Sequence, residues 1–457
     1  CFPTCGISFL PPDPIIPEVS LSVGIRDGRS GTQGIRRPAE PPWTSGLTLI
    51  QLIHVTRMRI AIFTDTYHPE INGVVTSVDT VANELRQQGH TVFLFAPRYF
   101  GRKDPHPQHV RFPSIPFPFP QMKERRISLP WGGVFRKFGS LDIDIIHSQV
   151  PGTVGIYALV ASWIWRVPHV HTYHTHYMEY THYMPFPRSF SSRAVRWIAQ
   201  HFCGRCQHVI SPSRGMREII KGHGVDAPVS VVPTGFDHTA RRTRLTLSEL
   251  FEKYQLGPAE RVAGKRLLVS VGRLGREKNI CFLVRAVAEI RRKHDVHFLM
   301  IGNGPDREEI EEEIDRLDLR EAVTLVGYVE HDDVFSFLEQ SELFIFASLT
   351  ETQGLVLLES MAMGTPVVAL EGIGISDLLE NDTGGLRTPL DMAAFVRNAD
   401  RMLGDSGLLE HKRQQAVARA REWSVENQIV RIARIYEQSI RDFKRHGLPR
   451  YHHRHRY

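Results

Sequence analysis

Short apolar runs alternate with amphipathic segments along most of this chain. The runs Met58–Phe63, Phe298–Ile301 and Leu343–Ser348 consist mainly of hydrophobic residues, and glycine or polar residues follow each of them. Apolar runs of this length are typical of strands that are buried on both faces of a parallel sheet. Because these strands alternate with helical patterns, the sequence predicts α/β architecture with doubly wound sheets.

Length and composition indicate the number of domains and the cellular environment of the protein. A chain of 457 residues exceeds one typical domain, so we expect two domains, each with its own core. No apolar run reaches the length of a transmembrane helix. The five cysteines are few and irregularly spaced, which fits a reducing cytoplasm better than a disulfide framework.

The two ends of the chain differ from the rest. Residues 1–57 are rich in proline, glycine and serine and lack sustained periodicity, so we expect a disordered or non-native extension with the natural start at Met58. At the other end, Arg441–Tyr457 carries six Lys/Arg and one Asp. Such a basic tail either contacts anionic lipid or nucleic acid or is simply solvated.

A pair of glutamates, Glu351 and Glu359, stands where an apolar strand passes into a helix. The helix is predicted from Gly354 to Met363, ended by Gly364. Ligands of open α/β sheets bind at the carboxyl ends of strands, so both carboxylates are candidates for ligand contacts. The alternative is that Glu351 only caps the helix and Glu359 is solvated.

Two further strand ends carry glycine turns. Val269–Lys278 is a strand followed by a Gly-Arg turn, with Lys278 five positions after Arg273. Phe298–Pro305 ends in Gly-Asn-Gly-Pro, where the backbone can approach a flat ligand closely. An arginine and a lysine at one strand end suit a diphosphate.

From Met58 to about residue 440, the chain resembles the retaining, nucleotide-sugar-dependent glycosyltransferases of family 4. The Glu-x7-Glu, Gly-Arg-x4-Lys and Gly-Asn-Gly-Pro elements all match. The resemblance implies a GT-B fold, in which two Rossmann-like doubly wound domains face a central cleft. Its expected parts are an acceptor-side domain at 58–235, a nucleotide-sugar domain at 236–422, and a last helix with the basic tail at 423–457, the helix packing back on the first domain.

The resemblance also implies roles for individual residues. Arg273 and Lys278 hold the donor diphosphate in place of a metal, Glu351 contacts the donor sugar and Glu359 binds the ribose. The expected catalytic residues are His174, Arg273, Lys278 and Glu351. The expected donor-binding residues are Gly73, Arg273, Lys278, Asn303, Gly304, Tyr328, Val329, Glu351, Gly354, Leu355 and Glu359. No cofactor is expected beyond the nucleotide sugar.

The first domain supplies Gly73 and His174. The Asn72-Gly73 turn opens a helix, whose N–H groups attract phosphate, although such a turn is also an ordinary structural element. His174 belongs to a histidine-rich stretch that includes His169, His171, His176 and His182, and Cys203 and Cys206 form a CxxC pair. The spacing lacks a zinc signature, so no metal site is predicted. His174 is the residue that the resemblance places at the donor sugar.

The acceptor side combines aromatic and basic residues. A proline-aromatic loop with Phe117 and Phe119 precedes Arg125 and Arg126, and resembles the loop of family members that glycosylate diacylglycerol. The segment 193–202 places Arg193, Arg196 and Trp197 beside an apolar face of Val195, Ile198 and Phe202. Such a helix either lies on an anionic membrane surface or packs its apolar face against the protein core. We therefore expect a diacylglycerol acceptor, glucose from UDP-glucose, a peripheral position at the inner face of the plasma membrane, and no nucleic-acid partner.

Retention of configuration requires a carboxylate nucleophile or attack from the face that the nucleotide leaves. Neither Asp65 nor Asp144 can be assigned as a nucleophile from sequence, which favours front-face attack. The role of Asp377, where the family commonly has Pro-Glu, stays open. The alternatives are a soluble acceptor such as a sugar, inositol or small metabolite, a nucleotide-sugar epimerase, and a non-catalytic membrane protein. The sequence leaves the donor sugar and oligomeric state open.

Overall fold

The structure is a computed structural model that describes residues 57–70, 72–101, 104, 106–118, 125–174, 188–237 and 244–449. The side chains of residues 188–192 are not part of this description. Residues 57–457 form one compact unit. The expectations for the segment before Arg57 and for the end of the basic tail concern residues outside the described ranges.

The first sheet contains seven parallel strands in the order β3-β2-β1-β6-β7-β8-β9. Strand β1 pairs with β2 on one side and with β6 on the other. The strand order therefore reverses beside β1. The strands are β1 (Arg59–Phe63), β2 (Thr91–Pro97), β3 (His109–Phe112), β6 (Ile145–Ser148), β7 (His169–Thr172), β8 (His208–Ser211) and β9 (Val229–Val231).

The second sheet repeats this arrangement with six parallel strands in the order β12-β11-β10-β13-β14-β15. Here the order reverses between β10 and β13. The strands are β10 (Arg266–Val271), β11 (Val296–Ile301), β12 (Val323–Gly327), β13 (Leu343–Phe346), β14 (Val367–Leu370) and β15 (Gly385–Thr388). The predicted parallel, doubly wound sheets are thus confirmed.

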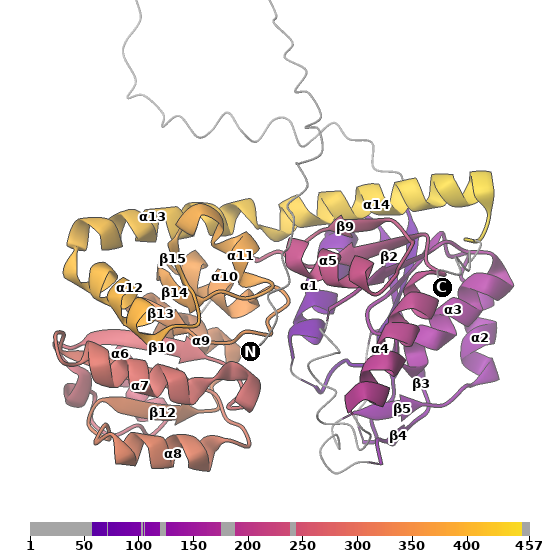
Figure 1. The fold of residues 1–457 in the computed structure, drawn as a ribbon. Coiled ribbons are helices and arrows are strands. Elements are labelled where there is room, and N and C mark those ends of the chain that lie inside the picture. Colours follow the sequence, from indigo (N-terminus) through magenta and orange to yellow (C-terminus); the bar gives the residue numbers. More distant parts are fainter. Residues whose placement is uncertain are drawn as a thin grey trace, which may run out of the picture. The chain divides into compact units, whose positions relative to one another are not determined.

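Helices connect most of the successive parallel strands, and Figure 1 shows these helices around both sheets. Those of the first half are α1 (Gly73–Gln87), α2 (Gly132–Gly139), α3 (Thr153–Trp165), α4 (Arg188–Cys203) and α5 (Arg214–Gly222), with an antiparallel hairpin of β4 (Ser114–Pro116) and β5 (Arg126–Ser128). Those of the second half are α6 (Leu247–Lys253), α7 (Ile280–Ile290), α8 (Arg307–Arg316), α9 (His331–Glu339), α10 (Leu355–Ala362), α11 (Ile375–Leu378), α12 (Met392–Gly404) and α13 (Ser406–Glu422). Three short 3-10 helices are η5 (Ala259–Val262), η6 (Arg276–Lys278) and η7 (Glu380–Asp382).

The last helix, α14 (Val425–His446), is yellow in Figure 1 and packs against α1 and β7 of the first half. Its apolar stripe, Ile429, Ile432, Ile435 and Tyr436, belongs to the same buried cluster as β1 and α1. The chain therefore passes between the halves twice. The two passages pair as a β-bridge between Phe236 and Ser424.

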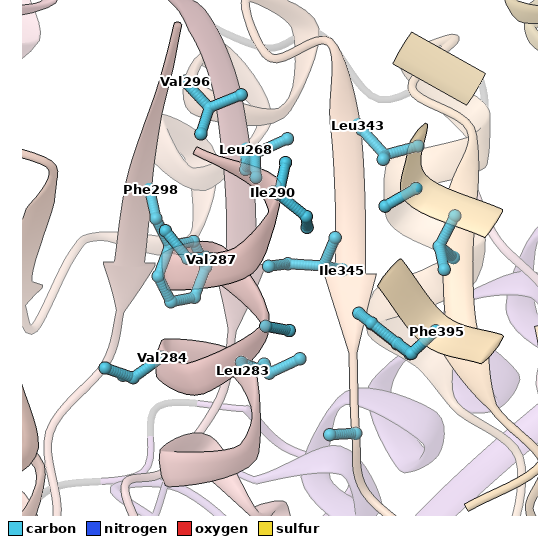
Figure 2. Packing of buried hydrophobic residues seen from close by; sticks show 14 of the residues in the cluster. Leu268, Leu283, Val284, Val287, Ile290, Val296, Phe298, Leu343, Ile345 and Phe395 are labelled. Atoms are coloured by element: carbon cyan, nitrogen blue, oxygen red, sulfur yellow. The ribbon is translucent and has the colours of Figure 1, made fainter. Parts of the chain in front are cut away.

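The core of the second half shows why its sequence adopts this fold. Figure 2 shows Phe298, Leu268 and Ile345, from three neighbouring strands, packed beside Val287 of α7. All four side chains are fully buried. The strands present apolar side chains to helices on both faces, which is why their sequences are continuous apolar runs rather than alternating ones.

Truncation of Phe298 tests this core. Replacing Phe298 by Ala is expected to lower the free energy of unfolding by about 3–5 kcal/mol, because it removes a ring from a close-packed site and leaves a cavity. Replacing the exposed Leu390 by Ala should change it by about 0.5 kcal/mol or less. Urea denaturation of both variants measures the difference. Equal effects would contradict the packing described for β11.

Candidate functional site

Three glycine turns lie side by side at the carboxyl edge of the second sheet. The N–H of Gly302 donates to the carbonyl of Gly327 (2.8 Å), and the N–H of Leu274 donates to the carbonyl of Asn303 (3.1 Å). A Cβ atom on Gly302 would lie 1.9 Å from the carbonyl oxygen of Gly272, and one on Gly304 would lie 2.2 Å from that of Leu274. Only glycine permits this close approach. It brings the predicted turn after β10, which contains Gly272, against the predicted turn after β11, which contains Gly302 and Gly304.

The predicted lysine and the first glutamate meet at this edge. The Nζ of Lys278, in η6, forms an ion pair with Oε1 of Glu351, in the loop between β13 and α10. The ammonium also lies 5.8 Å from the ring centre of Phe346. Arg273 lies in the turn before η6 with its side chain exposed. Residues 73 positions apart in the sequence thus form one charged cluster.

The second glutamate has a partner that sequence reasoning missed. Glu359 of α10 accepts a hydrogen bond from Nε2 of His331, at 3.2 Å. His331 is the first residue of α9, and the Gly327 turn precedes that helix. In the same segment Tyr328 is exposed and Val329 is buried. A histidine at a helix start carries no distinctive sequence signal, so only the fold relates it to Glu359.

Gly73 lies against the second half. A Cβ atom on Gly73 would lie 3.7 Å from Cδ1 of Leu355, the first residue of α10. The structure therefore brings together two predicted donor-binding residues that are far apart in the sequence. However, the side-chain oxygen of Asn72 already accepts hydrogen bonds from the N–H groups of Val74 and Val75, both at 3.1 Å. This cap therefore satisfies two of the N–H groups that were predicted to attract phosphate.

His174 follows β7 and connects to the Glu351 loop. Its Nε2 donates to Oε1 of Gln149 (2.6 Å), and its carbonyl oxygen accepts a hydrogen bond from the hydroxyl of Thr352 (2.8 Å). Burial lowers the pKa of His174 to about 4, so the ring is neutral at pH 7. Because Thr352 is the neighbour of Glu351, this bond places two predicted catalytic residues close together.

Gln353 makes a second connection between the halves. Its buried carboxamide accepts a hydrogen bond from the N–H of Thr234 and donates to the carbonyl of Thr234, both at 2.7 Å. Thr234 lies in the segment where the chain passes from the first sheet to the second. Sequence reasoning missed Gln353. The sequence signal that could have identified this residue is its amide side chain within the Glu-Thr-Gln-Gly element, just before an apolar run.

The histidine-rich strands form a buried hydrogen-bond network. The hydroxyl of Ser148 bonds to Nε2 of His169 (2.7 Å) and Nδ1 of His171 (2.9 Å), and His147 bonds to Thr172 and Tyr436. Burial lowers the pKa of His147 and of His169 to about 3, and that of His171 well below its usual value. At pH 7 the histidines of this network are therefore neutral.

These histidines and the CxxC pair carry side chains of the kinds that bind metal ions. Within the ranges described, no group of three or more His, Cys, Asp or Glu side chains is placed to hold a metal ion. Cys203 and Cys206 are buried free thiols, and burial raises the pKa of Cys203 to about 12. His176 and His182 lie outside the described residues.

The residues expected on the acceptor side have different environments. Arg126 donates to the hydroxyl (2.6 Å) and the carbonyl (2.8 Å) of Ser114, so it holds the β4–β5 hairpin. Arg125 lies 3.6 Å from the carboxylate of Glu70. Phe117 is half-buried, and Phe119 lies outside the described residues.

On α4, Arg193, Arg196 and Trp197 are exposed, as a surface role requires. One detail of the predicted apolar face is wrong. Val195 and Phe202 are buried, whereas Ile198 is on the outer surface with Trp197. Ala199 lies on the buried side instead, because residues four positions apart, such as Val195 and Ala199, lie on nearly the same face of a helix.

Three aspartates left open by sequence have structural partners. Asp65 accepts hydrogen bonds from the N–H groups of Val154 (2.8 Å) and Gly155 (3.1 Å), and burial raises its pKa. Asp144 precedes β6, at the edge opposite to His174, and accepts from the N–H of Arg59. Asp377 of α11 accepts from the N–H of Arg214, at the start of α5 in the first half (2.5 Å).

Two families of known proteins match parts of this chain. Residues 71–240 match the model of glycosyltransferase family 4, and residues 265–405 match that of the glycosyl transferases group 1. The chain is also 32% identical over 340 residues to an alpha-monoglucosyldiacylglycerol synthase of Streptococcus pneumoniae, covering 72% of this chain and 74% of the relative. The chain belongs to glycosyltransferase family 4. This confirms the resemblance on which the site residues were predicted.

Other relatives and solved structures agree with this family. The alpha-monoglucosyldiacylglycerol synthase of Acholeplasma laidlawii is 28% identical, covering 68% of this chain and 80% of the relative. A GDP-mannose-dependent alpha-mannosyltransferase of Mycolicibacterium smegmatis is 27% identical, covering 73% and 85%. Anabaena HepE, solved in complex with UDP-glucose, superposes with a TM-score of 0.64 at 19% identity, covering 84% of this chain and all (100%) of HepE. The GT-B fold predicted for this family 4 glycosyltransferase is confirmed.

Among the described residues, no helix combines the length and the hydrophobicity that a membrane span requires.

The contact between Gln353 and Thr234 yields a first kinetic prediction. Replacing Gln353 by Leu removes both hydrogen bonds and releases the loop that carries Glu351. We expect kcat/KM for the donor to fall about 10- to 100-fold, because small displacements of catalytic groups have effects of this size. Replacing the exposed Gln414 by Leu provides a matched control. Steady-state kinetics that give equal values for both variants would contradict a positioning role for Gln353.

The histidine network yields a pH prediction. Folded His169 stays neutral down to a pKa of about 3, whereas an unfolded histidine takes up a proton near 6.5. Below pH 6.5 the unfolded state therefore binds more protons, and stability falls by about 1.4 kcal/mol per pH unit for each such histidine. Urea denaturation between pH 7.5 and 4.5 measures this slope.

Replacing His169 by Asn should lower stability at pH 7.5 and reduce the slope below pH 6.5. Replacing the exposed His411 by Asn serves as the control and should leave the slope nearly as it is. An unchanged slope in the His169 variant would show that the acid sensitivity arises elsewhere.

Proposed function

We propose that this family 4 glycosyltransferase transfers a hexose, glucose from UDP-glucose, to the free hydroxyl of 1,2-diacylglycerol with retention of configuration. The observation that carries the proposal is the cluster of Lys278 and Glu351 beside the glycine turns, with His174 joined to it through Thr352. The names of two relatives that align over most of their length, both alpha-monoglucosyldiacylglycerol synthases, support the sugar and the acceptor.

In the proposed donor complex, each part of the cluster meets a part of the nucleotide sugar. The turns at Gly302 and Gly327 flank the base, and Glu359 accepts hydrogen bonds from the ribose hydroxyls. Arg273 and Lys278 bind the diphosphate, and Glu351 accepts hydrogen bonds from the sugar. With two cations at the leaving group, the proposal needs no metal or other cofactor.

The proposed reaction is a front-face substitution. The bond between C1 of the sugar and the phosphate oxygen breaks, the acceptor oxygen attacks C1 from the same face, and its proton passes to the departing phosphate. Lys278 and Arg273 stabilise the negative charge that develops on the nucleotide. The hydrogen bonds of Asp65 to the start of α3, and the place of Asp144 at the opposite edge, support a mechanism without a carboxylate nucleophile on the first sheet.

In this proposal His174 acts as a neutral hydrogen-bond partner of the donor sugar. Its lowered pKa, about 4, suits a group that donates or accepts a hydrogen bond without carrying charge. We further propose a peripheral location at the inner face of the plasma membrane, supported by the exposed Arg193, Arg196 and Trp197 of α4.

Donor turnover with defined acceptors tests the proposal. UDP- and GDP-sugars are supplied with vesicles of phosphatidylglycerol and phosphatidylcholine, with and without diacylglycerol, and the product is identified by mass spectrometry. The anomeric configuration follows from NMR of the product. Replacing Lys278 by Ala should lower kcat by about 10² to 10³, as loss of a group that stabilises developing charge typically does. Replacing Glu351 by Gln should also lower kcat, because it weakens the hydrogen bonds to the sugar and removes the carboxylate that pairs with Lys278.

Replacing Lys293 by Ala is a matched control, because this lysine forms a surface ion pair with Asp400. Transfer to a soluble sugar or inositol, with none to diacylglycerol, would contradict the lipid acceptor and leave the transferase intact. Release of free nucleotide with no transfer to any acceptor would favour an epimerase. Full activity of both site variants would contradict the assigned site.

A further inference from the structure

Helix α3 presents an apolar face to the outside of the molecule. Its sequence, Thr153–Trp165, contains no charged residue. One side of the helix, including Ala158 and Ala161, is buried against the first sheet, as expected for a crossover helix. The opposite side carries Ile156, Val160, Trp163 and Ile164, and 70% of Trp163 is exposed. Spacings of four, seven and eight residues place these side chains on one face of the helix.

The helices beside α3 extend this surface. The rings of Phe138 of α2 and Trp165 of α3 lie 5.1 Å apart, and Leu159 of α3 packs against the buried side of α4. Trp131, directly before α2, and Trp197 of α4 are about as exposed, at 59% and 60%. We call the outer faces of α2, α3 and α4 together the three-helix surface. An exposed apolar surface of this kind marks an interaction site.

The charge of the three-helix surface has one sign. Helices α2, α3 and α4 contain no aspartate or glutamate. Exposed Arg136 and Lys137 lie on α2, exposed Arg193 and Arg196 lie on α4, and Arg166 directly follows α3. The apolar stripe of α3 therefore has cationic side chains on both neighbouring helices and at its carboxyl end.

We propose that the three-helix surface docks onto an anionic lipid bilayer, with α3 at its centre. Tryptophan and isoleucine insert at the boundary of headgroups and acyl chains, and arginine and lysine pair with anionic headgroups. A second copy of the chain fits poorly, because a two-fold interface places the same patch on both sides and would bring basic residues against basic residues. The proposal deepens the proposed function, on which it rests for the membrane partner.

The surface is placed to serve the proposed site. Helix α3 starts at the carboxyl edge of the first sheet, where Asp65, two residues after β1, accepts hydrogen bonds from Val154 and Gly155. His174 follows β7 at the same edge. Ile156 begins the apolar stripe near this edge, so a bilayer in contact with α3 reaches the side of the sheet that holds the site. The free hydroxyl of diacylglycerol lies at the boundary of headgroups and acyl chains, which is the depth at which the docked residues would insert.

Vesicle sedimentation of the full chain tests the surface. The variant with Trp163→Glu and Ile164→Glu is compared with wild type on phosphatidylglycerol/phosphatidylcholine vesicles and on phosphatidylcholine alone. We expect wild type to bind the anionic vesicles and the variant to lose about tenfold or more in partitioning, because charge replaces inserted apolar area. Leu390→Glu, at an exposed leucine of the second half, is the control and should bind as wild type does.

A milder variant, Trp163→Ser, and circular dichroism of each protein separate loss of docking from loss of folding. Turnover of a short-chain, dispersed diacylglycerol should be unchanged in the variants, while turnover of vesicle-borne diacylglycerol falls with binding. Undiminished vesicle binding of both variants would overturn the docking surface and leave the proposed function intact. A wild-type dimer that the substitutions dissociate would also overturn it, in favour of a second copy.

Failure of the proposed function has a different signature. In that case no protein, wild type included, transfers sugar to dispersed or vesicle-borne diacylglycerol, whereas sedimentation still decides the docking surface independently of any transfer.

Discussion

Parallel pairing of the strands is the constraint from which the site follows. Every strand of both large sheets runs parallel to its neighbours, so each connection must cross back over a face of the sheet and all carboxyl ends lie at one edge. The turns at Gly272, Gly302 and Gly327 and the loop of Glu351 follow four strands of one sheet. They meet because the backbone hydrogen bonds of the sheet align the ends of those strands.

The second requirement is contact between the halves. The loop after β13 reaches the first half through two neighbouring side chains: Thr352 bonds to the carbonyl of His174, and Gln353 bonds to both backbone groups of Thr234. These contacts use polar backbone groups that are costly to leave unpaired when buried. They hold the loop of Glu351, on the second half, beside His174, on the first, although separate sheets carry the two residues.

The surface chemistry of the first half supports the proposed lipid acceptor. A crossover helix normally exposes polar residues on its outer side, yet α3 exposes tryptophan and isoleucine. The proposed bilayer contact gives this composition a physical reason, since the outer side would then face lipid rather than water. Arg125 and Arg126 of the hairpin, by contrast, have partners within the protein, whereas Arg193 and Arg196 of the three-helix surface are exposed.

The sequence alone determined the class of fold, because short apolar runs that alternate with helical patterns are typical of parallel strands buried on both faces. It also predicted the Lys278–Glu351 site, since both residues belong to motifs with fixed local spacing. Only the tertiary structure related Glu359 to His331 and Gln353 to Thr234, because these pairs join segments 28 and 119 residues apart and neither partner has a local pattern. Likewise, the apolar stripe of α3 is indistinguishable from a core helix in sequence. Its exposure depends on which side the sheet covers, and only the packed structure decides that.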